Sequence, residues 1–227
     1  MFKDLRPLTA EFVGTLLFVF LGAGSTVAFA AAGPSAAPIG LVGVALAHGI
    51  ALAIAVSATM SISGGHINPA VTTGLWIANK IEGRLAVQYI IAQLLGAVLG
   101  AALVKGVLPS LAVDLALGGT PKLAGNVTFT QGVWIEAILT FFLVSAVFGT
   151  AVSPAAPKLG GFGIGLTVLA DALVGGNMTG AAMNPARAFG PALVTWHWNA
   201  HAVYWIGPLL GAAVAGALWK AVLLPRS

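Results

Sequence analysis

The chain has 227 residues, of which 59% are hydrophobic and 7% are charged. Soluble domains carry roughly 25% charged residues, so this composition excludes an ordinary soluble protein and predicts one that lies in a membrane. The net charge of +4 comes from lysines and arginines that form no basic run, which argues against nucleic acid as a partner and favours lipid headgroups. The chain has no cysteine, which excludes disulfides and thiolate metal sites.

Six apolar runs are each long enough to cross a bilayer, which takes about 20 helical residues. They cover residues 8–31, 39–60, 84–107, 130–152, 160–178 and 201–224. Two more apolar stretches, residues 71–77 and 188–194, follow the second and fifth runs and are too short to cross. The sequence therefore predicts an all-α membrane protein with six transmembrane helices and two re-entrant half-helices.

Each short stretch follows the same tripeptide, Asn-Pro-Ala. The copies are Asn68, Pro69 and Ala70, and Asn184, Pro185 and Ala186. Asparagine is a good N-cap, and proline suits the first turn of a helix, where its missing N–H would have had no partner. If the asparagine oxygen caps its helix, we expect the amide NH2 to be free to donate hydrogen bonds outward. One copy is a weak signal, because Asn-Pro is common at turns, but two copies in matching positions are a strong one.

Three correspondences in the same order indicate an internal duplication. Glu11 matches Glu136, the two Asn-Pro-Ala copies match each other, and residues 93–97 match residues 208–212, with offsets of 115 to 125 residues. Each half has three spans, so the second half is inverted relative to the first. An inverted repeat places its functional site near the bilayer midplane. We expect one transmembrane domain over residues 1–227, with halves of about 1–108 and 126–227.

The basic residues predict how the chain is oriented. One face of the six-span arrangement collects Lys3, Arg6, Lys80, Arg84, Lys158, Lys220 and Arg226. Only Lys105 and Lys122 fall in loops on the other face. By the positive-inside rule, this distribution predicts a multi-pass protein of the cell membrane with both termini in the cytoplasm.

Glu11 and Glu136 are ionisable groups within apolar runs, where burying a charge is unfavourable. Two interpretations are open. The pair could relay protons, or each carboxylate could accept hydrogen bonds from the irregular backbone that leads into a half-helix. One carboxylate per half favours the second interpretation, a structural brace. Asp171 is a third buried acid without a repeat partner, and its role cannot be assigned.

Arg187 directly follows the second Asn-Pro-Ala and lies within the predicted membrane region. It could pair with an acid, or it could be a fixed cation that lines a narrow passage, repelling cations and donating hydrogen bonds to a neutral solute. The first half has Val71 at the equivalent position, and this asymmetry favours selectivity. His48 in the second run could pack inside the bundle or line the same passage.

The remaining histidines do not resemble a metal site. His197 and His201 occur among Trp196, Trp198, Tyr204 and Trp205, which predicts an aromatic belt at the membrane surface. Irregular backbone within a membrane is tolerated where it lines a water-filled path, so we expect carbonyl groups before both motifs to face such a path. These carbonyls belong to Gly64, Gly65, His66, Gly180 and Ala182.

With these residues, the chain resembles the aquaporin (major intrinsic protein) family over essentially its whole length. The resemblance rests on the paired motifs, on Ser-Gly-Gly-His before the first, on Arg187 after the second, and on a glutamate in the first and fourth runs. It implies a right-handed bundle with one pore per protomer and a homotetramer. It also implies that Asn68 and Asn184 hold the permeating water at mid-pore, where two positive helix ends oppose cations.

The family's outer constriction has four positions, which fall here on His48, Ala172, Ala181 and Arg187. Strictly water-selective bacterial members carry an aromatic residue in the second span and a histidine in the fifth. A histidine in the second span with alanine in the fifth is similar to plant vacuolar aquaporins and to the animal ammonia-permeable branch. The glycerol branch carries aspartate where this chain has Ala188. The compact loops are similar to those of prokaryotic members.

The sequence thus predicts a passive channel for water that excludes ions and protons, with ammonia, hydrogen peroxide or urea as further neutral solutes. A glycerol facilitator is one alternative. An ion-coupled secondary transporter is another, and it requires Glu11, Glu136 or Asp171 to titrate in the pathway. A structural membrane protein without permeability is a third. No enzyme activity, cofactor or metal is expected, and the partners are water, small neutral solutes and the lipid bilayer.

Overall fold

A computed structural model describes residues 5–33 and 40–225, and these residues form helices and connecting turns without strands. The long helices are α1 (Arg6–Ala32), α2 (Gly40–Ser63), α4 (Gly83–Val107), α6 (Phe129–Val147), α7 (Phe162–Gly175) and α9 (Val203–Leu218). Wider final turns extend α6 to Val152 and α9 to Leu223. The predicted all-helical membrane fold is confirmed.

Helix α7 is shorter than the run predicted over residues 160–178. It has 14 residues, whereas α1, α2, α4, α6 and α9 are each long and apolar enough to cross a membrane. Glycines at both ends explain the difference. Gly160 has a φ of 57°, and Gly175 and Gly176 lead into an irregular segment that contains Gly180 with a φ of 85°. The residues after Gly175 therefore belong to the approach to the second Asn-Pro-Ala motif.

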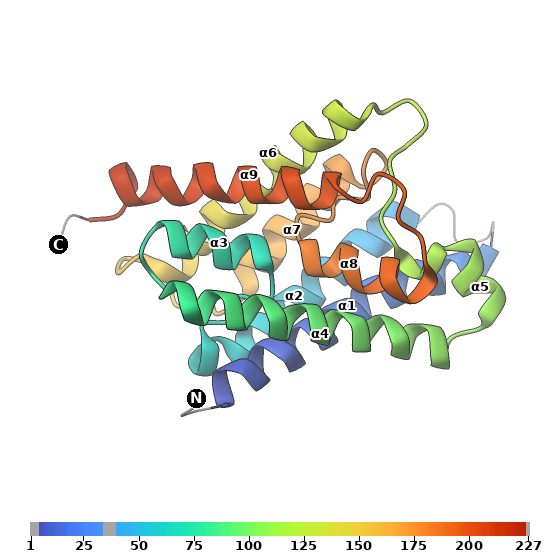
Figure 1. The fold of residues 1–227 in the computed structure, drawn as a ribbon, viewed down its shortest axis with the longest axis horizontal. Coiled ribbons are helices and arrows are strands. Elements are labelled where there is room, and N and C mark those ends of the chain that lie inside the picture. The colour runs from blue at the N-terminus through green and yellow to red at the C-terminus, as the bar shows by residue number, and fades with distance from the viewer. Residues whose placement is uncertain (1–4, 34–39, 226–227) are drawn as a thin grey trace.

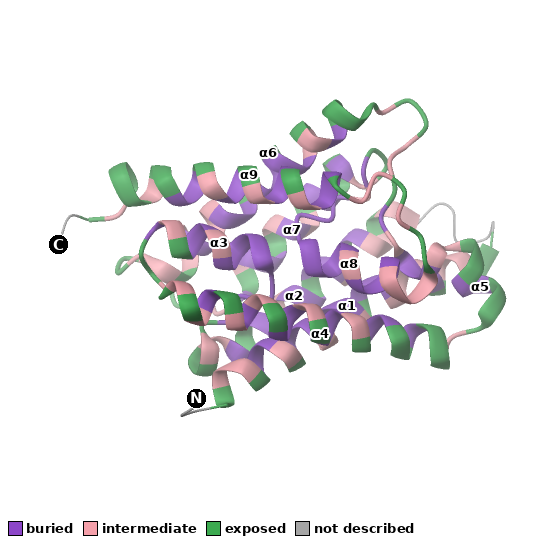
Figure 2. Cartoon of the chain, in the orientation of Figure 1, coloured by how far each residue is buried: buried purple, intermediate pink, exposed green. Residues whose placement is uncertain are grey.

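The two predicted half-helices are α3 (Pro69–Ile77) and α8 (Pro185–Thr195). They lie in the middle of the bundle between α4 and α9, and their N-terminal ends face each other (Figure 1). Each packs closely against a long helix of the other half, α3 against α9 and α8 against α4. Most of their residues are buried, as the purple segments of Figure 2 show.

The long helices pack in two matching sets. Helix α1 packs against α2 and α4, α6 packs against α7 and α9, and α2 meets α7 between the sets. Glycines make the approach close. A Cβ atom at Gly100 of α4 would lie 2.7 Å from the Leu16 carbonyl oxygen, and one at Gly207 of α9 would lie 2.7 Å from the Val133 carbonyl oxygen. Small residues at such contacts let helices pack tightly in lipid.

The connection between the halves contains structure that the sequence analysis did not predict. A short helix, α5 (Ser110–Leu115), is followed by a tight turn over Leu117–Gly119. This turn packs against α1 and α8. Helix α1 begins and α9 ends toward the same end of the bundle (Figure 1). Lys3 and Arg226, which contribute to the predicted orientation, lie outside the described residues.

Candidate functional site

Both asparagines of the paired motifs cap their half-helices, as predicted. The Asn68 side-chain oxygen accepts a hydrogen bond from the Ala70 N–H at 2.8 Å. The Asn184 oxygen accepts bonds from the N–H groups of Ala186 and Arg187 at 3.0 and 3.2 Å. Both asparagines are 2% exposed. Their side chains are therefore fixed at the N-termini of α3 and α8, deep within the bundle.

The amide groups of these asparagines link the two halves. Asn68 Nδ2 donates to the Met183 carbonyl at 2.8 Å, and Asn184 Nδ2 donates to the Ile67 carbonyl at 3.0 Å. We expected both NH2 groups to donate hydrogen bonds outward, and one N–H of each does so to the protein itself. The two half-helices approach closely enough for each amide to reach the backbone that precedes the other asparagine. An asparagine amide has two donors, so one N–H of each remains.

The backbone that precedes each asparagine is strained. Ile67 has a φ of 56° and Met183 a φ of 51°. A left-handed conformation is unfavourable for a residue with a side chain by about 1–2 kcal/mol. A buried carboxylate holds each strained segment. Glu11 accepts the N–H groups of His66 and Ile67 at 2.9 and 2.6 Å.

Glu136 repeats this arrangement in the second half. Its carboxylate accepts the N–H groups of Ala182 and Met183 at 2.9 and 2.7 Å. Neither Glu11 nor Glu136 is exposed. A carboxylate accepts hydrogen bonds from two backbone donors more favourably than a neutral oxygen does. The two acids thus satisfy backbone groups that have no water to bond in the bundle interior.

Five further side chains complete these two braces, and the sequence analysis missed this role of theirs. Gln93 Nε2 donates to Glu11 at 2.8 Å. The Ser63 and Thr179 hydroxyls donate to Glu11 and Glu136 at 2.6 and 2.7 Å. The Tyr89 and Tyr204 hydroxyls donate to the carbonyls of Ser63 and Thr179 at 2.9 and 2.8 Å. The signal was present, since the tyrosines are 115 residues apart, like residues 93–97 and 208–212.

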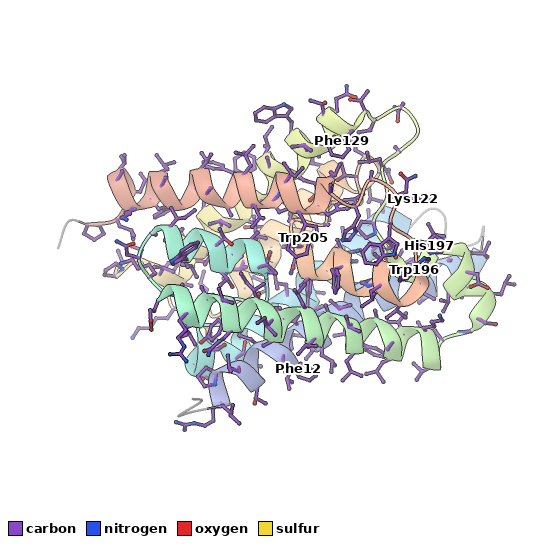
Figure 3. The ribbon with its side chains drawn as sticks, in the orientation of Figure 1. Phe12, Lys122, Phe129, Trp196, His197 and Trp205 are labelled. Atoms are coloured by element: carbon purple, nitrogen blue, oxygen red, sulfur yellow. The ribbon has the colours of Figure 1, made fainter. Side chains whose placement is uncertain are left out.

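Tyr204 was predicted to lie in an aromatic belt at the membrane surface, and this is wrong. Its side chain is fully buried, because its hydroxyl is needed by the second brace. Trp196, by contrast, is 74% exposed. It lies with His197 and Lys122 toward the end of the bundle opposite to the start of α1 (Figure 3). The aromatic cluster is thus divided between the surface and the interior.

A cavity of about 430 Å³ opens beside α2, α7 and α8. His48, Ala172, Ala181 and Arg187, the four residues predicted to form the constriction, all line it, and so does Gly180. Four chain segments bring these residues together, namely α2, α7, the irregular segment after α7 and the first turn of α8. Arg187 is 4% exposed and His48 is 6% exposed. The cavity is therefore lined by a buried guanidinium and a buried imidazole.

Arg187 is held by a carbonyl and an imidazole. Its Nη1 donates to the Gly119 carbonyl at 2.8 Å, and its Nη2 lies 3.2 Å from His48 Nε2. His48 Nδ1 lies 2.8 Å from the Val44 carbonyl, so it carries the proton and leaves Nε2 to accept from Arg187. These contacts do not pair Arg187 with an acid, which was the alternative interpretation.

Gly119, whose carbonyl holds Arg187, is a residue of this site that the sequence analysis missed. It lies in the unpredicted turn after α5 with a φ of 80°, and a Cβ atom there would come within 2.7 Å of the Ala23 Cα atom on α1. Only glycine fits this position without a shift of the backbone. No local pattern marks Gly119, because its role depends on the turn meeting α8 in space.

The five carbonyls expected to face a wet path make no hydrogen bond with the protein among residues 5–33 and 40–225. They are those of Gly64, Gly65, His66, Gly180 and Ala182. Asp171, whose role could not be assigned, is 6% exposed, and its Oδ2 has no hydrogen-bond partner in the part of the chain that the structure describes. In that same part, no three His, Asp or Glu side chains are grouped as a metal would require.

The sequence as a whole matches a known family. The sequence profile of the family described as major intrinsic protein matches residues 1–219. The chain belongs to this family. It is 45% identical to aquaporin TIP1-2 of Musa acuminata, over 98% of this chain and 88% of that protein. It is 44% identical to aquaporin TIP2-1 of Arabidopsis thaliana, over 99% of this chain and 90% of that protein.

A solved structure supports the fold of this major intrinsic protein. The aquaglyceroporin from Plasmodium falciparum superposes with a TM-score of 0.85 at 24% identity, and the match covers 96% of each chain. The predicted family resemblance and the multi-pass membrane fold are confirmed. The similarity to prokaryotic members stays a prediction.

Lysines hold the outer ends of both half-helices in this major intrinsic protein. Lys105 Nζ of α4 donates to the Val194 carbonyl of α8 at 3.0 Å, and Lys220 Nζ beyond α9 donates to the Ile77 carbonyl of α3 at 3.2 Å. A cation at a helix C-terminus satisfies a free carbonyl and complements the helix dipole. The sequence analysis used both lysines only as orientation signals.

Proposed function

We propose that this protein is a passive water channel that excludes ions and protons. The observation that carries the proposal is the pair of buried asparagines at the facing N-termini of α3 and α8, each with one amide N–H left to donate. The aquaporin names of the relatives support the same function. In this proposal Asn68 and Asn184 are the pore centre, and Pro69, Ala70, Pro185 and Ala186 shape the first turns beside it.

Positive helix ends and hydrogen-bond donors at the pore centre orient the water molecule. The N-termini of α3 and α8 carry positive partial charges that converge on one point. A water molecule there accepts from the asparagine amides through its oxygen, and its hydrogens point away toward the next acceptors. The carbonyls of Gly64, Gly65, His66, Gly180 and Ala182 supply such acceptors on both sides. The converging positive ends repel cations and hydronium.

The second barrier is the constriction formed by His48, Ala172, Ala181 and Arg187. The guanidinium donates hydrogen bonds to a neutral solute and repels cations, while the two alanines leave more room than larger side chains would. We therefore propose ammonia, hydrogen peroxide and urea as further solutes. A glycerol facilitator is less well supported, because Ala188 stands where the resemblance places the aspartate of the glycerol branch.

The outer surface of the bundle supports a place in lipid and contacts between copies of the chain. Large apolar side chains such as those of Ile50, Leu95, Ile138 and Val214 are exposed on the outer faces of the bundle. A surface of this kind fits lipid or other copies of the chain. We propose a homotetramer in the cell membrane, with both termini cytoplasmic and with halves 1–108 and 126–227 forming one channel domain. The start of α1 and the end of α9 at one end of the bundle support the shared side of the termini (Figure 1).

The competing function is ion-coupled transport. It can be tested at Asp171. Glu11 and Glu136 are occupied by backbone donors, whereas Asp171 Oδ2 has no partner in the described residues. For a passive channel, Asp171→Asn is expected to leave water permeability unchanged in vesicles with and without a proton gradient. A folded Asp171→Asn protein that loses a gradient-dependent transport present in the wild type would support coupling instead.

A panel of solutes tests the proposed function directly. Purified protein in proteoliposomes is exposed to gradients of water, glycerol, urea, ammonia and hydrogen peroxide, with empty vesicles as the control. We expect fast water flux, slower flux of some small neutral solutes, and no change when a proton gradient is imposed. Flux of glycerol that exceeds flux of water would favour the facilitator. Absence of all flux would favour a structural protein.

A further inference from the structure

The imidazole of His48 lies directly against a glycine of α1. A Cβ atom at Gly22 would lie 2.8 Å from His48 Cδ2 and 2.9 Å from His48 Nε2. Real Cβ atoms do not approach other heavy atoms this closely, so any side chain at position 22 would displace the ring. Gly22 is buried within α1, and the ring occupies the space that its missing side chain leaves.

The other contacts of the ring hold it against α1. His48 Nδ1 is bonded to the Val44 carbonyl at 2.8 Å, and Nε2 lies 3.2 Å from Arg187 Nη2. Phe18 of α1 packs edge-on against the imidazole, with the ring centroids 6.1 Å apart. The imidazole also lines the cavity, together with Ala172 and Ala181, whose side chains are only methyl groups. A displaced ring therefore moves toward the passage.

The next residue of α1 supports the other side of the constriction. Ala23 packs against Gly119, whose carbonyl accepts from Arg187 Nη1 at 2.8 Å. Consecutive residues of α1 thus lie behind the histidine and behind the carbonyl that holds the arginine. Helix α1 thus packs behind the constriction, although none of the four side chains of the constriction belongs to α1.

We propose that Gly22 is a positioning residue that sets the width of the constriction. It allows His48 to retract against α1 and to hold Arg187 through Nε2. This inference rests on the proposed channel function and adds to it a residue outside the pore lining. The end of a histidine side chain moves more readily than a helix backbone, so a small side chain at position 22 changes the constriction rather than the fold.

Gly22→Ala and Gly24→Ala form a matched pair for the test. Both replace a glycine of α1 by alanine, and both gain the same helix propensity. A Cβ atom at Gly24 would lie 3.5 Å from Val104 Cγ2 and 3.9 Å from Leu108 Cδ1, which is ordinary packing. In proteoliposomes we expect Gly22→Ala to lower water permeability several-fold and Gly24→Ala to leave it at the wild-type value.

His48→Ala distinguishes positioning from a general packing defect. If Gly22 acts through the imidazole, then Gly22→Ala has no further effect in the His48→Ala background, and the double variant conducts water like His48→Ala alone. If Gly22→Ala alone fails to fold, the same logic predicts that adding His48→Ala restores folding. Wild-type permeability in a folded Gly22→Ala protein, or an equal loss with and without His48, would overturn the proposal. Lack of conduction by the wild type would instead overturn the channel function itself.

Discussion

Replacement of Arg187 by valine is expected to admit larger neutral solutes and to allow some leak of cations. The change removes a buried positive charge and shortens a side chain that lines the cavity. Val71 occupies the equivalent place in the first half, so valine suits the first turn of a half-helix. We expect the ratio of urea to water permeability to rise about tenfold, which corresponds to about 1.4 kcal/mol of barrier height.

The control for this variant is a second cation of the same cavity. Lys122 lines the cavity but is exposed, so Lys122→Met is expected to keep the wild-type ratio. Arg187→Lys is expected to be intermediate, because lysine keeps the charge but cannot bond Gly119 and His48 through one planar fork. Stopped-flow light scattering measures all three variants. An unchanged ratio without ion leak in folded Arg187→Val protein would remove Arg187 from the selectivity mechanism.

Replacement of Glu136 by glutamine is expected to destabilise the fold strongly. The carboxylate accepts from the N–H groups of Ala182 and Met183 and from the Thr179 hydroxyl. Glutamine offers one oxygen, and its NH2 group faces donors that then lack a partner. Each hydrogen bond to a charged group contributes about 1.5–3 kcal/mol, so we expect a loss of about 2–5 kcal/mol in the free energy of unfolding. The strained φ of Met183 would lose its restraint.

Thermal unfolding in detergent measures this effect. Glu11→Gln is expected to behave in the same way, because Glu11 accepts from His66, Ile67, Ser63 and Gln93. Glu82→Gln is the control, since Glu82 is exposed at the start of α4. A Glu136→Gln protein that unfolds at the wild-type temperature would show that the carboxylate is not a brace, and would return proton relay to consideration.

Much of the fold could be predicted from sequence because its signals are local. Apolar runs mark the long helices, and the Asn-Pro pairs mark the starts of α3 and α8 through capping and the missing proline N–H. The inverted repeat follows from matched residues and an odd number of spans. The four residues predicted to form the constriction were placed by the family resemblance, and the structure gathers them around one cavity.

The parts that could not be predicted depend on contacts between distant segments. Gly119 bonds Arg187 only because an irregular turn passes between α1 and α8. Tyr204 occurs in a sequence segment rich in aromatic residues, which suggests a surface position. Its hydroxyl instead donates to the buried carbonyl of Thr179. The hydrogen bonds from Asn68 and Asn184 to the other half of the chain could be predicted only from the distance between the two half-helices. No local sequence pattern encodes this distance. No sequence pattern marks Gly22, and its importance is visible only in the contact with the His48 ring.

The most direct test of the channel is the osmotic water permeability of proteoliposomes and its temperature dependence. A continuous wet path past Asn68 and Asn184 predicts shrinkage much faster than that of empty vesicles, with an activation energy close to that of water diffusing in bulk. Water permeability no greater than that of the bare bilayer would contradict the account. So would an activation energy as high as that of water crossing the lipid without the protein.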